Sequence, residues 1–300
     1  MTKNVLASIF AAARELVRSP RALAVLSALY VALIASIFFF ITTRVATLWQ
    51  LFVTGASFLL APLLFFAVQA AGAGYAVGHR GARALARHTA RSFLKVLVAS
   101  IPFILLAVLS IYLLDKLEQR VQLSPEERAR IEYARSSAQA DEGESASAAE
   151  ASRPKPPVRW KFLFVSALRL FVLGLVLPLA AIHLWLAVAR DGLLAAFARI
   201  HRHLGRAFSA RSVFAYGVGM IVFALIPYFL ITKRTPVSNN TLELTIFGAR
   251  IFLALSLMLF GWVMTLTALA DADAGQQTAT AEPALDEPHP HAAMAPAATS

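Results

Sequence analysis

Three ionisable side chains lie within or beside long apolar segments, where charged groups are rare and usually serve a function. Arg169 and His183 belong to one such segment, and Arg250 belongs to another. Each arginine stands about 20 residues, roughly one hydrocarbon thickness, from the far end of its segment. One hypothesis is that Arg169 and Arg250 line an outward-facing polar cleft and hold a phosphate or carboxylate, with His183 deeper as a protonation switch.

Helical periodicity supports this grouping, because steps of about 100° per residue produce two polar meridians. The first comprises Ser166, Arg169, His183 and Asp191, and the second comprises Glu243, Arg250, Gly261 and Thr265. The alternative is that both arginines snorkel to outer-leaflet phosphates, and that His183 is a neutral hydrogen-bonding group between helices. The sequence leaves both interpretations open.

Three basic arms flank the apolar segments, and each has the pattern of an amphipathic helix. In the first arm, Val5, Ile9 and Leu16 fall on one side, and Arg14, Arg18 and Arg21 fall on another. The second arm places five basic residues on one helical stripe, namely Arg80, Arg83, Arg87, Arg91 and Lys95. The third arm opposes Arg199, Arg202 and Arg206 to an apolar face of Leu193, Leu194, Phe197, Ile200, Leu204 and Phe208.

The arms predict helices that lie flat in the membrane interface, with apolar faces among acyl chains and basic side chains at anionic headgroups. Anionic membrane lipids are therefore the predicted partners. A simpler interpretation is that the basic residues only anchor the chain and set its topology. In either case the basic excess is explained without nucleic acid.

Two further patterns concern helix geometry. Gly72, Gly74 and Gly78 do not follow a predicted strand, so they indicate close helix packing rather than a dinucleotide site. Prolines interrupt four of the apolar segments, at Pro62, Pro102, Pro178 and Pro227. We interpret them as kinks, since the resemblance of the segments around Pro102 and Pro227 is too weak to assert a repeat.

Catalytic motifs are missing from the sequence. There is no H-E-x-x-H, no Walker phosphate loop and no G-x-S-x-G elbow. The chain has no Cys, and His201 and His203 are two residues apart, so they point in different directions on a helix. We therefore expect no enzymatic activity, no cofactor and no metal site.

These side chains must be positioned by membrane helices. The chain has 300 residues, of which 58% are hydrophobic and 15% charged, which is too apolar for a soluble domain. Crossing the hydrocarbon takes roughly 20 apolar residues as a helix. The sequence predicts an all-α protein with six membrane spans, at 22–43, 48–76, 94–114, 162–189, 212–232 and 244–270.

Charge in the short loops predicts the orientation. Half of the 28 Lys and Arg residues lie in the three arms when Lys3, Arg190 and Arg211 at their ends are included, whereas the opposite short loops carry Arg44, Lys233 and Arg234. The positive-inside rule then places both termini in the cytoplasm of a cell with the chain in its inner membrane. Residues 115–160 form an extracytoplasmic loop in this scheme, and the acidic, Pro-containing residues 271–300 form a disordered cytoplasmic tail.

The leading functional interpretation is a non-enzymatic membrane protein whose inner-leaflet amphipathic helices bind lipids. The first alternative is a transporter or permease for an anionic or lipid-like substrate. The second is a membrane-embedded enzyme of an unfamiliar type. Protein partners and the oligomeric state are not indicated by the sequence.

Overall fold

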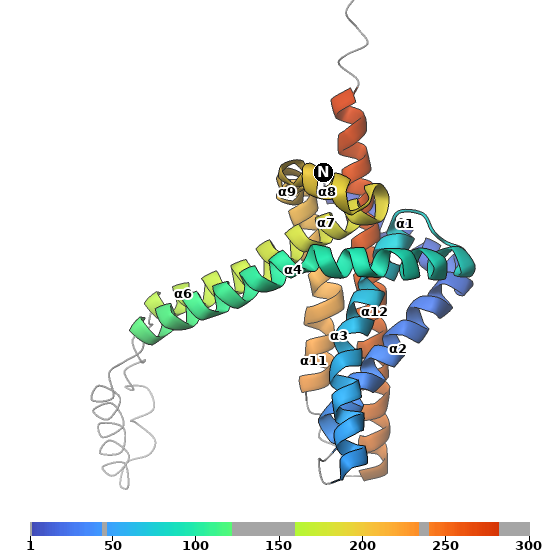
Figure 1. Cartoon of the computed structure of the whole chain (residues 1–300), viewed down its shortest axis with the longest axis vertical. Coiled ribbons are helices and arrows are strands. Elements are labelled where there is room, and N and C mark those ends of the chain that lie inside the picture. The colour runs from blue at the N-terminus through green and yellow to red at the C-terminus, as the bar shows by residue number, and fades with distance from the viewer. Residues whose placement is uncertain (1, 44–46, 122–159, 234–239, 282–300) are drawn as a thin grey trace, which may run out of the picture. The chain divides into compact units, whose positions relative to one another are not determined.

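The computed structural model describes residues 2–43, 47–121, 160–233 and 240–281, and these ranges contain helices and short connections without a strand (Figure 1). The all-α prediction is therefore confirmed. In chain order the elements are α1 (Thr2–Arg18), α2 (Pro20–Thr42), α3 (Leu48–Ala76), α4 (Ala82–Val121), α6 (Trp160–Phe171), η3 (Val172–Val176), α7 (Leu177–Asp191), α8 (Leu193–Ala198), α9 (Ile200–Ala207), α10 (Ala210–Met220), η4 (Ile221–Leu225), α11 (Ile226–Thr232) and α12 (Asn240–Ala281).

Six helical stretches in these described ranges are long and apolar enough to cross a membrane, as the sequence predicts. They are Pro20–Thr42, Leu48–Ala76, Ala82–Arg120, Leu163–Asp191, Ala210–Thr232 and Thr241–Ala274. Most of them leave large apolar side chains exposed, such as Phe38, Phe52 and Leu105, at 59%, 65% and 64%. Large exposed apolar surfaces of this kind are typical of contact with lipid.

Several boundaries differ from the prediction. The second basic arm and the third span form one continuous helix, α4, which also continues to Val121, inside the predicted loop 115–160. Helix α12 continues to Ala281, inside the segment 271–300 that we expected to be disordered. The hydrophobic pattern ends before these helices do, because a helix ends where its backbone bonding stops rather than where apolar residues stop. The rest of the loop and of the tail lies outside the described residues.

Local signals explain where the helices start and stop. Ser19 and Pro20 separate α1 from α2, and Pro20 occupies the first turn of α2, where its missing N–H costs nothing. Thr47 and Gln50 form a reciprocal capping box at the start of α3. After α3, Gly78 takes a φ of +105°, and the His79 N–H donates to the Gly74 carbonyl across the turn.

Two of the four prolines follow a widened helical turn. η3 and η4 are π-helical, and the residue just before the proline, Leu177 or Ile226, donates its N–H to the carbonyl five positions earlier. Proline has no N–H and its ring crowds the preceding turn, so an extra residue in that turn relieves the conflict. Pro62 and Pro102 lie in α3 and α4, which are assigned as α-helices throughout.

The chain forms two compact units, residues 1–100 with 179–300 and residues 101–178. In the first unit, a buried cluster joins five helices and contains Leu16, Ala22, Leu26, Ala71, Tyr75, Leu85, Leu259 and Val263. Every residue from 179 to 188 in α7 is buried, so other parts of the unit surround this stretch on all sides. The Trp185 indole donates to the Ser100 hydroxyl at 2.8 Å within this core.

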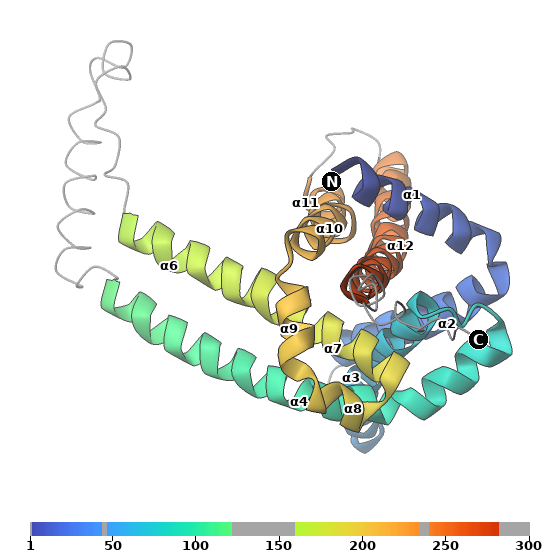
Figure 2. The ribbon, with the colours of Figure 1, turned by 90° about the horizontal axis from the view of Figure 1, so that it is seen from above.

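The first unit has two distinct ends. Helices α8 and α9 lie at one end, and the C-terminus of α11 and the N-terminus of α12 lie at the other (Figure 1). Viewed from above, the chain turns after α7 and runs back through α8 and α9 (Figure 2). Helix α1 contacts α2, α10 and α12.

The second unit is a helical hairpin. The second half of α4 lies alongside α6 in both views (Figures 1 and 2). Val165 is buried at 3% exposure, whereas Phe164 beside it is 65% exposed. This hairpin therefore presents much of its apolar surface outward.

Candidate functional site

The first basic arm is docked on the helix bundle. Its apolar side, with Ile9, Ala12 and Leu16, is buried against protein, and Leu16 belongs to the core cluster. For Ile9 and Leu16 the prediction that this side lies among acyl chains is therefore wrong, because neighbouring helices cover them, while the side chain of Val5 lies outside the described part of the chain. Arg14 and Arg18, one turn apart, are exposed, as the amphipathic pattern predicts.

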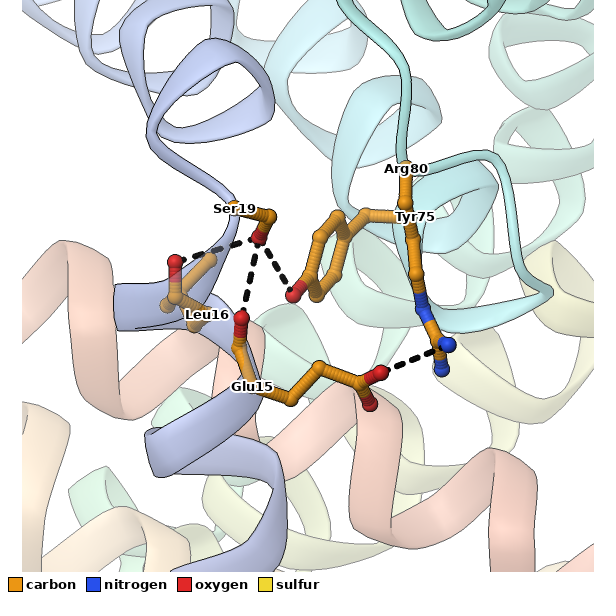
Figure 3. A network of polar contacts seen from close by, with 5 residues as sticks. All are labelled: Glu15, Leu16, Ser19, Tyr75 and Arg80. Carbon is orange, nitrogen blue, oxygen red and sulfur yellow. Dashed lines mark hydrogen bonds and ion pairs between the residues drawn. The ribbon is translucent and has the colours of Figure 1, made fainter.

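A polar network holds this arm to the ends of two other helices (Figure 3). The Ser19 hydroxyl lies 3.0 Å from the Tyr75 hydroxyl and 3.1 Å from the carbonyl oxygens of both Glu15 and Leu16. The Arg80 guanidinium forms an ion pair of 2.6 Å with the Glu15 carboxylate. The network thereby fixes the end of α1, the start of α2 and the turn after α3 relative to one another.

An open hollow of about 810 Å³ lies beside α1. Its lining residues are Ala7, Phe10, Ala11, Arg14, Glu15, Arg18, Ser19 and Arg80. The lining therefore carries three guanidinium groups and one carboxylate, with apolar side chains at one side. Within the part of the chain that the structure describes, neither Arg14 nor Arg18 has a carboxylate partner.

A smaller hollow of about 390 Å³ borders the same arginine. Its lining includes Arg80 and His79 from the turn after α3, Arg190 from α7 and Asp271 from α12. Sequence analysis did not place Arg80 and Arg190 near each other, because they are far apart along the chain. Arg80 thus stands between two hollows whose linings are rich in basic groups.

The predicted stripe of the second arm is exposed on α4. Arg83, Arg87, Arg91 and Lys95 face outward, and the opposite face is buried through Leu85, Thr89, Ser92 and Val96. Arg80 was expected on the same helical stripe, but it precedes α4, which begins at Ala82. Its side chain is free to contact Glu15 because it belongs to a turn.

The third arm consists of two short helices rather than one. Helices α8 and α9 are separated at Arg199, whose φ of −112° and ψ of 20° are not helical. Arg199 and Arg202 are exposed, and Arg206 is half-buried. On the apolar side, Leu194 is 86% exposed and Phe208 is 45% exposed. Part of this side is thus left uncovered by the protein, unlike that of α1.

Arg169 does not present an unoccupied guanidinium. Its Nη1 atom lies 3.3 Å from an Asp115 carboxylate oxygen and 3.5 Å from one of Glu118, both on α4 in the same unit. Two carboxylates exceed the charge of one arginine, so this group favours a cation over an anion. The predicted ligand-binding arginine is thus in contact with two carboxylates of its own unit.

Arg250 stabilises the end of another helix. Its Nε donates to the Leu230 carbonyl at 2.8 Å, and its Nη2 donates to the Lys233 carbonyl. Leu230 lies in the last turn of α11 and Lys233 is the C-cap residue, where carbonyl acceptors have no partner within the helix. Two donors of the predicted ligand-binding Arg250 are thus used in capping the C-terminus of a helix.

His183 is buried and has a partner that sequence analysis missed. Its Nδ1 lies 3.2 Å from the carboxylate of Asp273 on α12, and the two side chains are 1% and 4% exposed. A signal existed in the sequence, because Leu266, Ala270 and Asp273 recur at helical spacing and the first proline after them is Pro283. The sequence prediction, by contrast, places Asp273 in the disordered tail 271–300.

The predicted meridian of the fourth span is not continuous. Ser166 and Arg169 are exposed, whereas His183 is buried. The π-helical turn η3 between them adds one residue and rotates the following face by about 100°. A constant step of about 100° per residue therefore does not predict which residues share a face across this turn. In α12, Gly261 and Thr265 are buried as predicted for an inward meridian, but Glu243 is exposed.

His203 on α9 is a second buried histidine in this region, at 6% exposure. Burial lowers its pKa below the usual value, and the charge of Arg206 lowers it further. Asp273 and Asp191 partly oppose this by raising the pKa. Among the described residues, no group of three or more His, Asp or Glu side chains is placed to hold a metal ion.

Comparison of the chain with models of known protein families, with curated proteins and with solved structures gives no match.

Proposed function

We propose that this multi-pass protein is a non-enzymatic protein of the cell's inner membrane that binds anionic phospholipid headgroups in the hollow beside α1. The observation that carries the proposal is the convergence of Arg14, Arg18 and Arg80 from two different arms on one hollow. The volume, about 810 Å³, falls within the range of roughly 300–1,000 Å³ that small ligands occupy in proteins.

The charge of the hollow suits a phosphate. Glu15 neutralises Arg80, so Arg14 and Arg18 provide an excess of positive charge. Guanidinium groups bind phosphate oxygens through paired N–H donors. This paired geometry makes the interaction stronger and more specific than the contact of a single point charge. Each basic side chain near an anionic membrane surface contributes on the order of 1 kcal/mol.

The surroundings of the hollow suit a lipid rather than a free phosphate. Phe10 lines the hollow and is 72% exposed, so an apolar ring stands next to the guanidinium groups. The positive-inside rule supports placing this end of the first unit at the cytoplasmic surface, where anionic lipids are enriched. The exposed stripe on α4 and the exposed Leu194 and Phe208 suit the same surface.

The transporter alternative receives less support. It needs an inward-facing polar path that links Arg169, Arg250 and His183. Arg169 is paired with two carboxylates, and Arg250 caps α11.

The proposal can be tested by native mass spectrometry of the full-length protein after mild detergent exchange with phosphatidylglycerol. The test variant is Arg14→Gln with Arg18→Gln, and the control is Arg87→Gln with Arg91→Gln, which removes equal charge from exposed positions outside the hollow. Losing two contacts of about 1 kcal/mol each should weaken retention of the lipid roughly 30-fold.

The control should retain phosphatidylglycerol at the wild-type level, and zwitterionic phosphatidylcholine should be retained weakly by all three proteins. Equal retention by the wild type and the Arg14/Arg18 variant would overturn the proposal. An equal loss of phosphatidylglycerol in the control would also contradict the proposal, because lipid binding would then be spread over the basic surface and not located in the hollow.

A further inference from the structure

The smaller hollow adjoins the hollow beside α1, because Arg80 lines both. Its volume of about 390 Å³ falls within the range of roughly 300–1,000 Å³ that small ligands occupy. The Arg80 guanidinium points toward Glu15, which lines the hollow beside α1 (Figure 3). A place for one headgroup therefore has a second, unassigned place directly next to it.

Arg80 can serve both places at once. Its ion pair with Glu15 is formed by Nη1 at 2.6 Å, and the arginine side chain is 51% exposed. A guanidinium group has five N–H donors in a fixed plane, so one ion pair leaves others able to reach a phosphate. Arg80 is thus a shared wall with donors for an anion in either hollow.

The smaller hollow lies where membrane spans end. Its lining comes from three segments, namely residues 76–80, 189–190 and 270–274. The candidate spans Leu48–Ala76, Leu163–Asp191 and Thr241–Ala274 all end within or directly beside these segments. Because a span ends where the hydrocarbon ends, this hollow lies at the depth of lipid headgroups.

The lining leaves space for an anion and provides a second arginine to hold it. Small side chains make up much of the wall, namely those of Ala76, Gly78, Ala189, Ala270 and Ala274. Arg190 is exposed, and it forms no ion pair with a carboxylate in the described part of the chain. Arg190 can therefore bind a phosphate at this end of α7.

The combined charge of the two hollows matches two phosphates. Apart from His79, their ionisable lining residues are four arginines and two acids, namely Arg14, Arg18, Arg80, Arg190, Glu15 and Asp271. Two positive charges are left over when each carboxylate offsets one guanidinium. A lipid with two phosphodiester groups carries two negative charges, whereas phosphatidylglycerol carries one.

We propose that the two hollows form one site for a phospholipid with two phosphate groups joined by a glycerol bridge, as in cardiolipin. This inference rests on the proposed function, since one phosphate occupies the hollow beside α1. The second phosphate lies in the smaller hollow with Arg190, and Arg80 stands between them. Joining the two phosphates covalently makes the second contact intramolecular, which strengthens binding beyond that of two separate lipids.

Competition measured by native mass spectrometry of the full-length protein in mild detergent tests the inference. Phosphatidylglycerol and cardiolipin with the same acyl chains are supplied together, with cardiolipin at half the molar concentration so that both supply equal phosphate. One further guanidinium–phosphate contact should make retention of cardiolipin by the wild type about fivefold stronger. Equal retention of the two lipids by the wild type would overturn the inference.

Two substitutions in the smaller hollow should change this preference in opposite directions. Arg190→Gln should abolish it and leave retention of phosphatidylglycerol unchanged, which also shows that the variant is folded. Asp271→Asn should increase it, because a carboxylate no longer repels the second phosphate. A full preference for cardiolipin in Arg190→Gln, or no increase in Asp271→Asn, would contradict the second phosphate position.

Arg199→Gln is the matched control, because Arg199 is exposed and lines neither hollow. This variant should keep the preference of the wild type. A loss as large as in Arg190→Gln would overturn the inference, since the preference would then follow total charge.

Failure of this inference differs from failure of the proposed function. If Arg14→Gln with Arg18→Gln lowers retention of phosphatidylglycerol but the wild type does not prefer cardiolipin, only the two-phosphate site is wrong. If that double variant retains both lipids as the wild type does, the hollow beside α1 binds neither, and both proposals fall.

A final arm separates a lipid from a soluble diphosphate. The headgroup obtained by deacylating cardiolipin has both phosphates and no acyl chain, and it is added at the concentration of cardiolipin. It should leave the cardiolipin bound, because it has nothing to place against Phe10. Displacement of half of the cardiolipin, as equal affinity requires, would assign the site to a soluble diphosphate and overturn the lipid.

Discussion

At the scale of single residues, His201 and His203 on α9 are two positions apart and have opposite surroundings. His201 is exposed, whereas His203 is 6% exposed and has no partner for its Nε2 among the described residues. Burial is the main cause that lowers the pKa of His203, with Arg206 acting in the same direction. His203 is therefore neutral at neutral pH.

The stability of the protein should fall in acid because of His203. Its pKa is lower in the folded state than in the unfolded state, so the unfolded state takes up the proton first. Stability is unaffected above about pH 6.5, the usual histidine pKa, and is lost as the pH falls through the folded value. His203→Gln should remove most of this loss, and His201→Gln should leave it unchanged.

Thermal unfolding in detergent between pH 4.5 and pH 7.5 measures this effect. The pair of variants separates a buried titrating group from a surface one, since both substitutions remove one histidine from α9. If His203→Gln and the wild type lost the same amount of stability in acid, groups other than His203 would be responsible for the loss.

At the scale of elements, glycines decide how closely α10, η4 and α12 approach. A Cβ atom at Gly219 would lie 2.7 Å from Thr265 Cγ2, and one at Gly261 would lie 3.0 Å from the backbone nitrogen of Phe223. Thr265 cannot easily withdraw, because it is buried and its hydroxyl donates to the Gly261 carbonyl at 2.6 Å. A side chain at either glycine would separate the helices.

Gly219→Ala should therefore destabilise the protein by about 1–3 kcal/mol through overpacking. Gly217→Ala is the control, because it lies on the same helix and its Cβ would meet nothing within 4 Å. That control should be neutral or slightly stabilising, since Ala favours a helix over Gly by about 1 kcal/mol. Unfolding by steric trapping in micelles compares the two, and equal stabilities would contradict the close packing.

At the scale of the whole molecule, basic groups concentrate at one end of the first unit. Arg14, Arg18 and Arg80 surround the larger hollow, and α8 and α9 carry further arginines. At the other end, Arg250 is occupied in capping α11. An asymmetric distribution of this kind favours a single orientation in the membrane.

Single cysteines test the orientation, because the chain has no native thiol. Gly81→Cys and Lys233→Cys place thiols at exposed positions after α3 and α11, respectively. In spheroplasts, an impermeant maleimide should label Lys233→Cys directly and label Gly81→Cys only after permeabilisation. Labelling of both positions in sealed spheroplasts would contradict an odd number of crossings between them and the proposed location of the hollow.

The apolar segments alone were sufficient to predict an all-α chain with six candidate spans. Length and hydrophobicity of about 20 consecutive residues are local properties, so they can be read directly from the sequence. The exposed faces of the basic arms followed in the same way, from helical periodicity over two or three turns, as Arg83, Arg87, Arg91 and Lys95 show.

The partners of the functional side chains depended on packing between distant segments. Arg169 meets Glu118 across 51 positions and His183 meets Asp273 across 90, and no local pattern specifies such pairs. The extra residue in η3 changed which face follows Arg169, and the continuation of α12 brought Asp273 into the core. These contacts form only where separate helices meet, because each polar group takes the acceptor or donor that packing places within about 3 Å of it.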